Sequence, residues 1–315
     1  MHVLGIDVGG TKTVCLLAND DGTILAEARE AGANLQRVGE LALEKVLHRV
    51  METALSSQRV TPSAICLGIA GVDRADDQTV VHAIMNRIGY KATILIVNDA
   101  LIALQAGIGD APGIVVVSGT GSIAYGRNAR GEAARAGGWG YVLGDEGSGY
   151  FIGRHALRAV VRHADGRGRE TSLTPRLLAH FGLTSATELI QTVYHEDLAP
   201  GAIGALAHFV QQARDGGDAV AAGILDRAAE ELVTTAAAVM RRLEMERESF
   251  SFVLAGGMFR AVPWLCDRLK ALLPALAAHS RTTRLDNEPA LGAVQLALAV
   301  SQGRAKIPAY RLNPT

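Results

Sequence analysis

The sequence carries one glycine-rich pattern twice, and this repeat limits the folds open to the chain. The segment LGIDVGGTKTVCLLANDDGTIL, residues 4–25, can be laid over GIVVVSGTGSIAYGRNARGEAA, residues 113–134. In this alignment Gly10 matches Gly119 and Thr11 matches Thr120. Each copy has alternating apolar positions on both sides of a glycine turn, which is typical of two strands joined tightly. The chain is therefore expected to contain two halves with one plan.

The remaining periodicity predicts the elements around each copy. Strands are expected over residues 2–8, 13–18, 23–31, 64–70 and 93–97, and helices over 41–55, 79–88 and 99–107. The segment GDAPG at 109–113 is the clearest boundary signal. Further on, FVLAGGMFR resembles the earlier CLGIAGVDR, and RLDNEPALGAVQLA resembles LIVNDALIALQAG. The second half is therefore expected to repeat the strand and helix steps of the first.

These observations predict an α/β protein of the duplicated actin-like (ribonuclease H-like) ATPase architecture, with two lobes around a central cleft. A chain of 315 residues exceeds the size at which one core usually stops growing. We expect an N-terminal lobe over 1–112 and a C-terminal lobe over 113–303, with a mostly helical insertion at about 149–246. The last helix is expected to pack back on the N-terminal lobe, and residues 304–315 form a tail.

Charge and hydropathy narrow the class of partner. The net charge is -1, and no long Lys/Arg cluster is present that would neutralise a nucleic acid or an anionic membrane. The first residues include Asp7 and Lys12 where a signal peptide needs an unbroken apolar stretch, and no run approaches the roughly 18 apolar residues of a membrane span. We expect a cytoplasmic protein that binds neither nucleic acid nor membrane.

The first glycine turn, Asp7-Val8-Gly9-Gly10-Thr11-Lys12-Thr13, has the features of an anion site. Successive backbone N–H groups in such a turn can converge on an anion, and the Thr11 hydroxyl and Lys12 ammonium can add to it. An acid facing a phosphate needs a cation between them, so Asp7 is predicted to hold Mg²⁺ through water. By itself the segment is equally typical of an ordinary hairpin turn.

The second copy favours nucleotide binding. Ser118-Gly119-Thr120-Gly121-Ser122 stands where the first copy has its turn, so two anion loops are expected to clasp one polyphosphate. The step Ala255-Gly256-Gly257 lacks side chains that would keep a base or ribose from the backbone. Close packing of a helix on a strand is the alternative explanation of those two glycines.

Asp99 follows an apolar strand and opens a helix, which places its carboxylate at the end of a strand where α/β proteins bind ligands. We predict that Asp99 is the general base, accepting a proton from a sugar hydroxyl as that hydroxyl attacks the γ-phosphate in line. Asp is also a favoured residue for capping a helix N-terminus, and the two roles are compatible.

The segment GGWGYVLGDEGSGY, residues 137–150, contains six glycines beside aromatic and acidic residues. So many glycines predict a shaped loop with accessible backbone groups. Trp139 offers an apolar face, and Asp145 and Glu146 offer carboxylates that can accept hydrogen bonds from vicinal hydroxyls. The loop is therefore predicted to bind a sugar, although Glu146 could instead cap the helix that follows.

The motifs DVGGTKT, NDA, SGTGS, GGWGYVLGDEGS and VLAGG occur in this order between residue 7 and about residue 258. Together they resemble the N-acetylglucosamine kinase group of the BadF/BadG/BcrA/BcrD ATPase family. The resemblance implies the actin-like fold, ATP with Mg²⁺, phosphorylation of the 6-hydroxyl of an amino sugar, N-acetylglucosamine above all, and a homodimer.

The resemblance also assigns roles to residues. For the sugar it implies Asn34, Asp99, Gly138, Trp139, Gly140 and Asp145, with Asp99 as base; for ATP it implies Thr11, Thr120, Ala213 and the Gly256-Gly257 turn. Animal members carry an aromatic residue where Gln36 stands and Glu where Asp7 stands. The missing aromatic residue leaves glucosamine and N-acetylmuramic acid open as substrates.

Three other activities are disfavoured. An ATPase activator of a dehydratase, in the same family, needs paired thiolates for an iron–sulfur cluster, whereas Cys15, Cys66 and Cys266 are isolated on predicted core elements. A sugar sensor would need a helix-turn-helix segment before Asp7. A kinase of the ROK type would carry a Cys-rich zinc motif, and this sequence has none.

Overall fold

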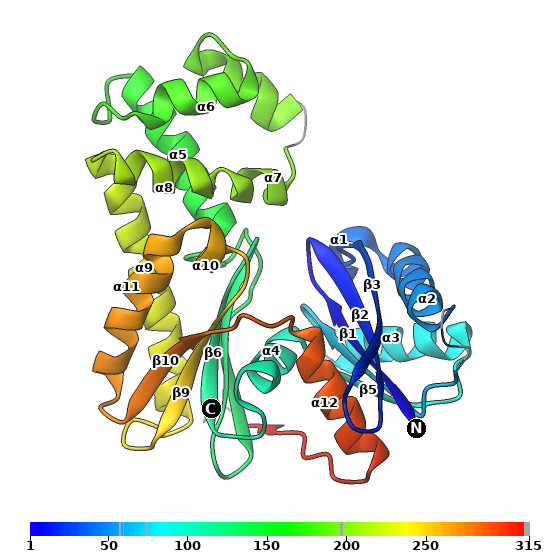
Figure 1. Cartoon of the computed structure of the whole chain (residues 1–315). Coiled ribbons are helices and arrows are strands. Elements are labelled where there is room, and N and C mark those ends of the chain that lie inside the picture. The colour runs from blue at the N-terminus through cyan, green and yellow to red at the C-terminus, as the bar shows by residue number, and fades with distance from the viewer. Residues whose placement is uncertain (57, 59, 73–74, 196–197, 312–315) are drawn as a thin grey trace. The chain divides into compact units, whose positions relative to one another are not determined.

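The computed structural model describes residues 1–311 except 57, 59, 73–74 and 196–197, and it has the predicted α/β class (Figure 1). The last four residues of the predicted tail, 312–315, lie outside the described residues. Two sheets, of five and six strands, carry the helices.

The first sheet has the strand order β3-β2-β1-β4-β5. Its strands are β1 (His2–Val8), β2 (Lys12–Asn19), β3 (Ile24–Ala31), β4 (Ala64–Ile69) and β5 (Thr93–Asn98). β1, β2 and β3 form an antiparallel meander, while β4 and β5 continue the sheet parallel to β1. The carboxyl ends of β1, β4 and β5 therefore meet at one edge.

Helices cover both faces of this sheet (Figure 1). They are α1 (Leu35–Val38), α2 (Glu40–Ser56), α3 (Ala75–Ile88), α4 (Asp99–Ile108) and α12 (Ala290–Ser301). Leu4, Ile6 and Val8 pack in one core cluster with residues of α2 and α3. Gly5 points the other way, because a Cβ there would lie 2.3 Å from the backbone nitrogen of Val294 in α12. Strand alternation puts Asp7 on the same face as Gly5, towards α4 and α12.

The second sheet has the order β10-β9-β6-β7-β8-β11. Its strands are β6 (Gly113–Ser118), β7 (Ser122–Arg127), β8 (Glu132–Gly137), β9 (Phe250–Ala255), β10 (Ser280–Arg284) and β11 (Ala309–Tyr310). Without β11, and read from the other edge, this order is β8-β7-β6-β9-β10. It equals the order of the first sheet with every strand number raised by five, so the predicted duplication is confirmed.

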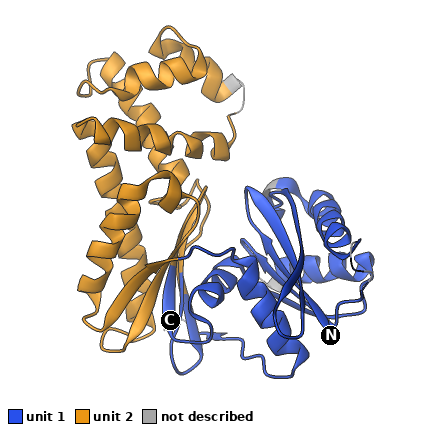
Figure 2. Cartoon of the chain, in the orientation of Figure 1, with its two compact units in different colours: residues 1–115, 125–134, 285–315 blue, residues 116–124, 135–284 orange. Residues whose placement is uncertain are grey.

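The chain divides into two compact units, coloured in Figure 2. Unit 1 contains residues 1–115, 125–134 and 285–315, and unit 2 contains residues 116–124 and 135–284. The division differs from a single border at residue 112 because α12 packs against β1 and α4. The predicted cleft between two lobes stays a prediction.

The helices of unit 2 lie mainly between β8 and β9. They are α5 (Gly149–Ala164), α6 (Leu173–Phe181), η1 (Ala186–Glu188), η2 (Gln191–His195), α7 (Pro200–Ala205), α8 (Ala207–Asp215), α9 (Ala219–Arg242), α10 (Met258–Ala261), α11 (Pro263–Leu272) and η3 (Leu273–Leu276). α5 is central and contacts α6, α7, α8 and α9. Across the described residues, no helix combines the length and apolar character needed to cross a membrane.

Candidate active site

The first glycine turn joins β1 to β2 in unit 1. The N–H of Gly9 donates to the carbonyl of Lys12 over 3.0 Å, which closes the turn. The chain after β3 braces it, since Gly32 donates to the carbonyl of Thr11 and Ala33 to that of Gly9. Gly10 and Thr11 are exposed at the tip. The turn has a fixed shape and an open tip, as a phosphate loop requires.

Lys12, predicted to bind phosphate, forms an ion pair. Its Nζ lies 2.5 Å from Oε2 of Glu288, and Glu288 also accepts from Arg29 over 3.0 Å. Glu288 lies two residues before Ala290, the first residue of α12, so it occupies the strand-to-helix step of the second copy, as Asp99 does in the first. Glu288 stands in none of the recognised motifs, although the repeat between RLDNEPALG and LIVNDALIA marks its position.

Asp7 is buried near the carboxyl end of β1. The pKa of its carboxyl is raised to about 7, first by burial and then by the negative charge of Asp99, while the charge of Lys12 opposes the rise. Strand register explains the influence of Asp99, because Val8, Ile69 and Asn98 are paired across β1, β4 and β5. Asp7 and Asp99 thus flank one row of the sheet, and the two carboxyls are electrostatic neighbours.

Asn98, not Asp99, is the N-cap of α4. The Asn98 side chain accepts from the N–H of Ala100 over 2.8 Å, with the extended backbone of a cap. Asp99 is the first helical residue, half-buried, and its Oδ1 also accepts from Ala100. The sequence-based expectation that Asp99 is the N-cap of α4 is therefore wrong, because Asn98 takes that position.

Asn34 lies just after β3 and caps α1. Its side-chain oxygen accepts from the N–H of Gln36 over 3.1 Å, and its Nδ2 is 3.5 Å from the carbonyl of Ala70. Gln36 is exposed, and its Nε2 donates to Asp77 over 2.8 Å. Asn34 is thereby fixed beside the end of β4, while Gln36 points towards α3.

The second glycine turn, in unit 2, is tied to the predicted sugar loop. Within the turn, Gly119 donates to the carbonyl of Gly121 over 2.9 Å. The hydroxyl of Ser118 donates to the carbonyl of Gly147, and that of Ser122 donates to the carbonyl of Glu146 over 2.6 Å. The two motifs that the sequence assigned to phosphate and to sugar form one structure in unit 2.

Asp145 is the residue that links them most closely. It is buried and has a φ of 61°, a left-handed conformation that is uncommon for residues other than glycine. Burial raises the pKa of its carboxyl, and backbone N–H groups of Ser122 and Gly140 that donate to it oppose the rise. A Cβ on Gly121 would lie 2.6 Å from Oδ2 of Asp145. The carboxylate therefore packs directly on the second glycine turn. Strained backbone of this kind is often kept where function requires it.

The glycine loop before Asp145 is open. Gly138 and Gly140 are exposed, and Trp139 is 66% exposed with the Arg135 guanidinium 5.3 Å from its ring centroid. Gly138 donates to the carbonyl of Ser122, which fixes the start of the loop. Trp139 thus presents an aromatic face stiffened by a cation–π contact.

The predicted cap of α5 also differs. Ser148 is the N-cap, its hydroxyl accepting from the N–H of Phe151 over 3.1 Å, so Glu146 lies before the cap. The expectation that Glu146 caps this helix is wrong, because the loop continues two residues further. The backbone of Gly149 then donates to the carbonyl of Gly119, which attaches the start of α5 to the second glycine turn.

The other residues predicted to bind ATP, Gly256, Gly257 and Ala213, differ in solvent exposure. Gly256 and Gly257 are exposed between β9 and α10, and a Cβ on Gly256 would lie 2.2 Å from the carbonyl oxygen of Ser118. Close packing on the second turn therefore explains Gly256 without a ligand. Ala213 is fully buried in α8. The ATP contacts of all three stay predictions.

The donor atoms suit a hard cation and not a cluster. Cys15, Cys66 and Cys266 are buried on β2, β4 and α11, and burial raises the pKa of the Cys15 and Cys66 thiols, so these thiols are poor cluster ligands. Nowhere in the described chain do three His, Cys, Asp or Glu side chains form a metal cluster. Mg²⁺ usually takes one or two carboxylates together with water and substrate phosphates. The buried carboxyl of Asp7 fits that pattern.

Comparison with known proteins identifies the family of this chain and similar proteins. The sequence pattern of the BadF/BadG/BcrA/BcrD ATPase family matches residues 4–297. A Clostridium acetobutylicum protein described as an N-acetylmuramic acid/N-acetylglucosamine kinase is 36% identical over 299 residues, which cover 94% of this chain and 98% of that protein. An N-acetyl-D-glucosamine kinase of Dictyostelium discoideum is 34% identical and covers 94% and 97%.

A solved structure is similar over the same length. It is described as a putative N-acetylglucosamine kinase from Chromobacterium violaceum, with a TM-score of 0.77, 27% identity and coverage of 94% of this chain and 98% of that chain. The predicted fold class agrees with this likeness, since both chains align almost from end to end.

Proposed function

Because the chain belongs to the BadF/BadG/BcrA/BcrD ATPase family and is an ATP-dependent sugar kinase, we propose that its acceptor is an amino sugar, with the 6-hydroxyl of N-acetylglucosamine as the favoured site of phosphorylation. N-acetylglucosamine is the sugar that the names of the Clostridium acetobutylicum and Dictyostelium discoideum relatives share. ATP supplies the phosphoryl group.

The observation that carries this proposal is the placement of Asp99. Its carboxylate stands at the carboxyl end of β5, where Asn98 has taken over the helix cap, and it is close enough to raise the pKa of Asp7. Asp99 accepts the proton of the attacking sugar hydroxyl, and no covalent intermediate is needed. Asn34, Gly138, Trp139, Gly140 and Asp145 bind the sugar in this proposal.

The two glycine turns bind the phosphates of ATP. Gly9, Gly10, Thr11 and Lys12 act from unit 1, and Gly119, Thr120 and Gly121 act from unit 2, with Ala213, Gly256 and Gly257 towards the nucleoside. Asp7 would hold Mg²⁺, which neutralises charge on the phosphates. Asp7 is the fitting ligand because its carboxyl is buried and, among the described residues, no cation is hydrogen-bonded to it, Lys12 being paired to Glu288.

A second acceptor, N-acetylmuramic acid, is favoured by Gln36. The exposed Gln36 side chain is turned to Asp77, so it builds no aromatic wall against the N-acetyl group. A site without that wall can admit a bulkier substituent on the sugar, such as a lactyl group. Glucosamine stays open for the same reason.

A coupled assay of ADP release tests the proposal with N-acetylglucosamine, N-acetylmuramic acid, glucosamine and, as control, glucose. The largest kcat/KM is expected for N-acetylglucosamine, and ³¹P–¹H correlation should place the new phosphate on the 6-oxygen. Equal kcat/KM for glucose would overturn the choice of an amino sugar. A brown protein containing iron would instead favour the dehydratase activator. The implied homodimer would appear as twice the chain mass in light scattering.

A further inference from the structure

A second polar cavity lies in unit 2, away from the glycine turns. It has a volume of about 370 Å³ and is bounded by α5, the loop after α5, and α9. Arg158, Arg162, Arg169, Arg227 and His155 line it, and we call it the arginine pocket. Ile224 and Val220 give it an apolar side.

The arginine pocket has no acidic lining residue among the described residues. Nor does any carboxylate in that part of the chain form an ion pair with the four arginines. The acidic side chains of α9 and of the loop after α5, namely Asp226, Glu230, Glu231 and Glu170, are not among the residues that line the pocket. Asp165 binds Arg167, and Asp218 accepts from the N–H of Ser172 over 2.6 Å. Four arginines therefore line one cavity whose described lining contains no carboxylate.

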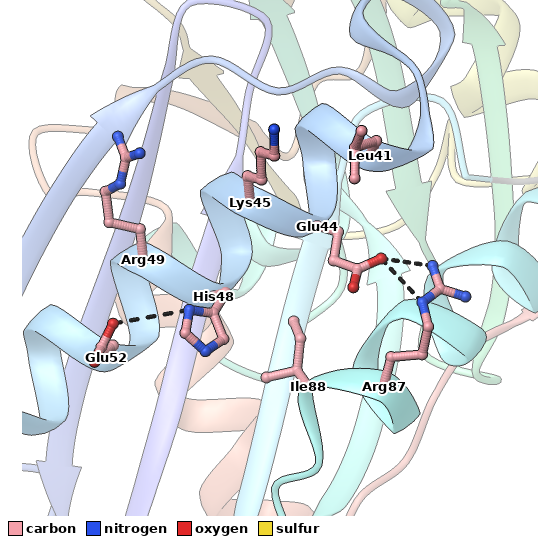
Figure 3. Close-up of a pocket in the computed structure, with 8 residues that line it drawn as sticks. All are labelled: Leu41, Glu44, Lys45, His48, Arg49, Glu52, Arg87 and Ile88. Atoms are coloured by element: carbon pink, nitrogen blue, oxygen red, sulfur yellow. Dashed lines mark hydrogen bonds and ion pairs between the residues drawn. The ribbon is translucent and has the colours of Figure 1, made fainter.

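Another cavity shows the opposite pattern. It lies between α2 and α3, has about 570 Å³, and is lined by charges of both signs (Figure 3). Arg87 lies 2.6 Å from Glu44, so a cation and a carboxylate of this cavity pair with each other, and His48 lies 3.8 Å from Glu52. Unpaired arginines are thus a particular property of the arginine pocket and not of every cavity in this chain.

The backbone holds the arginine pocket together. Gly168 donates to the carbonyl of Arg162 over 2.7 Å, and a Cβ on Gly168 would lie 2.9 Å from Cβ of Arg162. Arg162 also donates to the carbonyl of Arg167 over 3.0 Å. The loop is therefore packed on the end of α5, which keeps Arg169 beside Arg162 before any ligand binds.

We propose that the arginine pocket binds a compact anion carrying a phosphate group. Guanidinium groups bind phosphate oxygens through two parallel hydrogen bonds, and several of them around one cavity suit an anion of two or more charges. The volume is in the range of small-ligand sites, and the apolar side can contact a sugar ring or another non-polar part of the ligand.

The state of His155 is consistent with this. Burial lowers the pKa of His155, and the positive charges of Arg154, Arg227 and Arg158 lower it further. The pocket therefore carries a positive potential that discourages an additional proton. An anion that entered would relieve the repulsion between the arginines.

Isothermal titration calorimetry of the full chain tests the proposal, with three probes: inorganic phosphate, pyrophosphate and N-acetylglucosamine 6-phosphate. The variant Arg158→Gln with Arg227→Gln removes two exposed cations from different helices. The control is Arg241→Gln, which removes an exposed arginine from the same helix, α9, about 21 Å along its axis from Arg227. The arginines are exposed, so the variants are expected to fold, which their melting temperatures check.

Binding of at least one probe is expected, weakened about tenfold or more in the double variant and unchanged in Arg241→Gln. Tighter binding of the sugar phosphate would identify a phosphorylated metabolite as the ligand, and tighter binding of pyrophosphate an inorganic one. Absence of binding by all three probes would overturn the proposal. So would equal affinity in the wild-type protein and the double variant, since the anion would then lie elsewhere, for example at the glycine turns.

Discussion

The ammonium of Lys12 lies 2.5 Å from the carboxylate of Glu288, although 276 positions separate them in sequence. The pair connects the first glycine turn with the segment that enters α12, and Arg29 binds the same carboxylate. Lys12 can therefore reach a phosphate only by sharing or leaving this partner. Glu288 also raises the pKa of Asp7, after burial and the charge of Asp99.

Replacing Lys12 and Glu288 one at a time tests whether Lys12 binds phosphate or only forms the ion pair. Lys12→Met is expected to raise KM for ATP about tenfold, because a charge-assisted contact to phosphate is lost. Glu288→Gln is expected to leave KM for ATP unchanged or lower it, because it releases the ammonium. Both variants break the same half-exposed ion pair, worth about 1 kcal/mol or less. Equal rises of KM in the two variants would show that only the pair matters.

Asp99→Asn is expected to lower kcat by about 10²–10⁴ while ATP still binds, because the amide cannot accept the proton. Stability should barely change, since Asn98 is the cap. Asn98→Ala is the matched control, expected to cost about 1 kcal/mol of unfolding free energy. Steady-state kinetics and denaturant titration measure both. Near-normal kcat in Asp99→Asn would remove Asp99 from the role of base.

Asp7→Asn is expected to stabilise the protein in the absence of Mg²⁺ and to inactivate it. The pKa of Asp7 is about 7 in the folded protein against 3.8 as its ordinary value. The folded state therefore binds more protons than the unfolded state between these values, and the stability of the wild-type protein falls as pH rises through that window. The variant does not titrate, so its advantage should grow from pH 5 to pH 8, where it is on the order of 2–4 kcal/mol. A pH-independent difference in unfolding free energy would contradict the raised pKa.

Gly121→Ala is expected to destabilise unit 2. The new methyl group would lie 2.6 Å from Asp145, whose carboxylate is itself held by two backbone donors. The cost should be about 1–3 kcal/mol, as for overpacking of a buried site. Gly119→Ala is the control from the same turn, because a Cβ there meets no atom within 4 Å among the described residues. Thermal unfolding compares the two, and equal melting temperatures would speak against the packing of Asp145 on Gly121.

The sequence predicted the first half of the fold closely, because its strands alternate or run apolar between glycine and polar turns. The strand expected over 2–8 is observed as His2–Val8, and the helix expected over 41–55 as Glu40–Ser56. The helix expected over 79–88 begins earlier, at Ala75, since polar residues in a first helical turn carry no apolar periodicity. The first and last residues of helices are hard to predict for the same reason, because polar end residues carry no apolar periodicity.

The site was predictable where a motif is contiguous and not where it is assembled from distant segments. Asp7, Asp99 and Asp145 stand in recognisable motifs. Glu288 joins the first turn only through the packing of α12, and the arginine pocket combines Arg158 with Arg227 from another helix. Spacing along the chain does not reveal such partners, because tertiary packing brings them together.

The matching strand orders of the two sheets are the arrangement that tandem duplication of one unit would produce. In an ancestor built of identical subunits, any acid at one turn would have recurred at the other. The present chain has Asp7 in one copy and the buried Val116 at the corresponding position of the other. Within one chain each copy can change independently of the other, so the twin turns are chemically unlike, one preceded by a carboxyl group and one by a hydrocarbon.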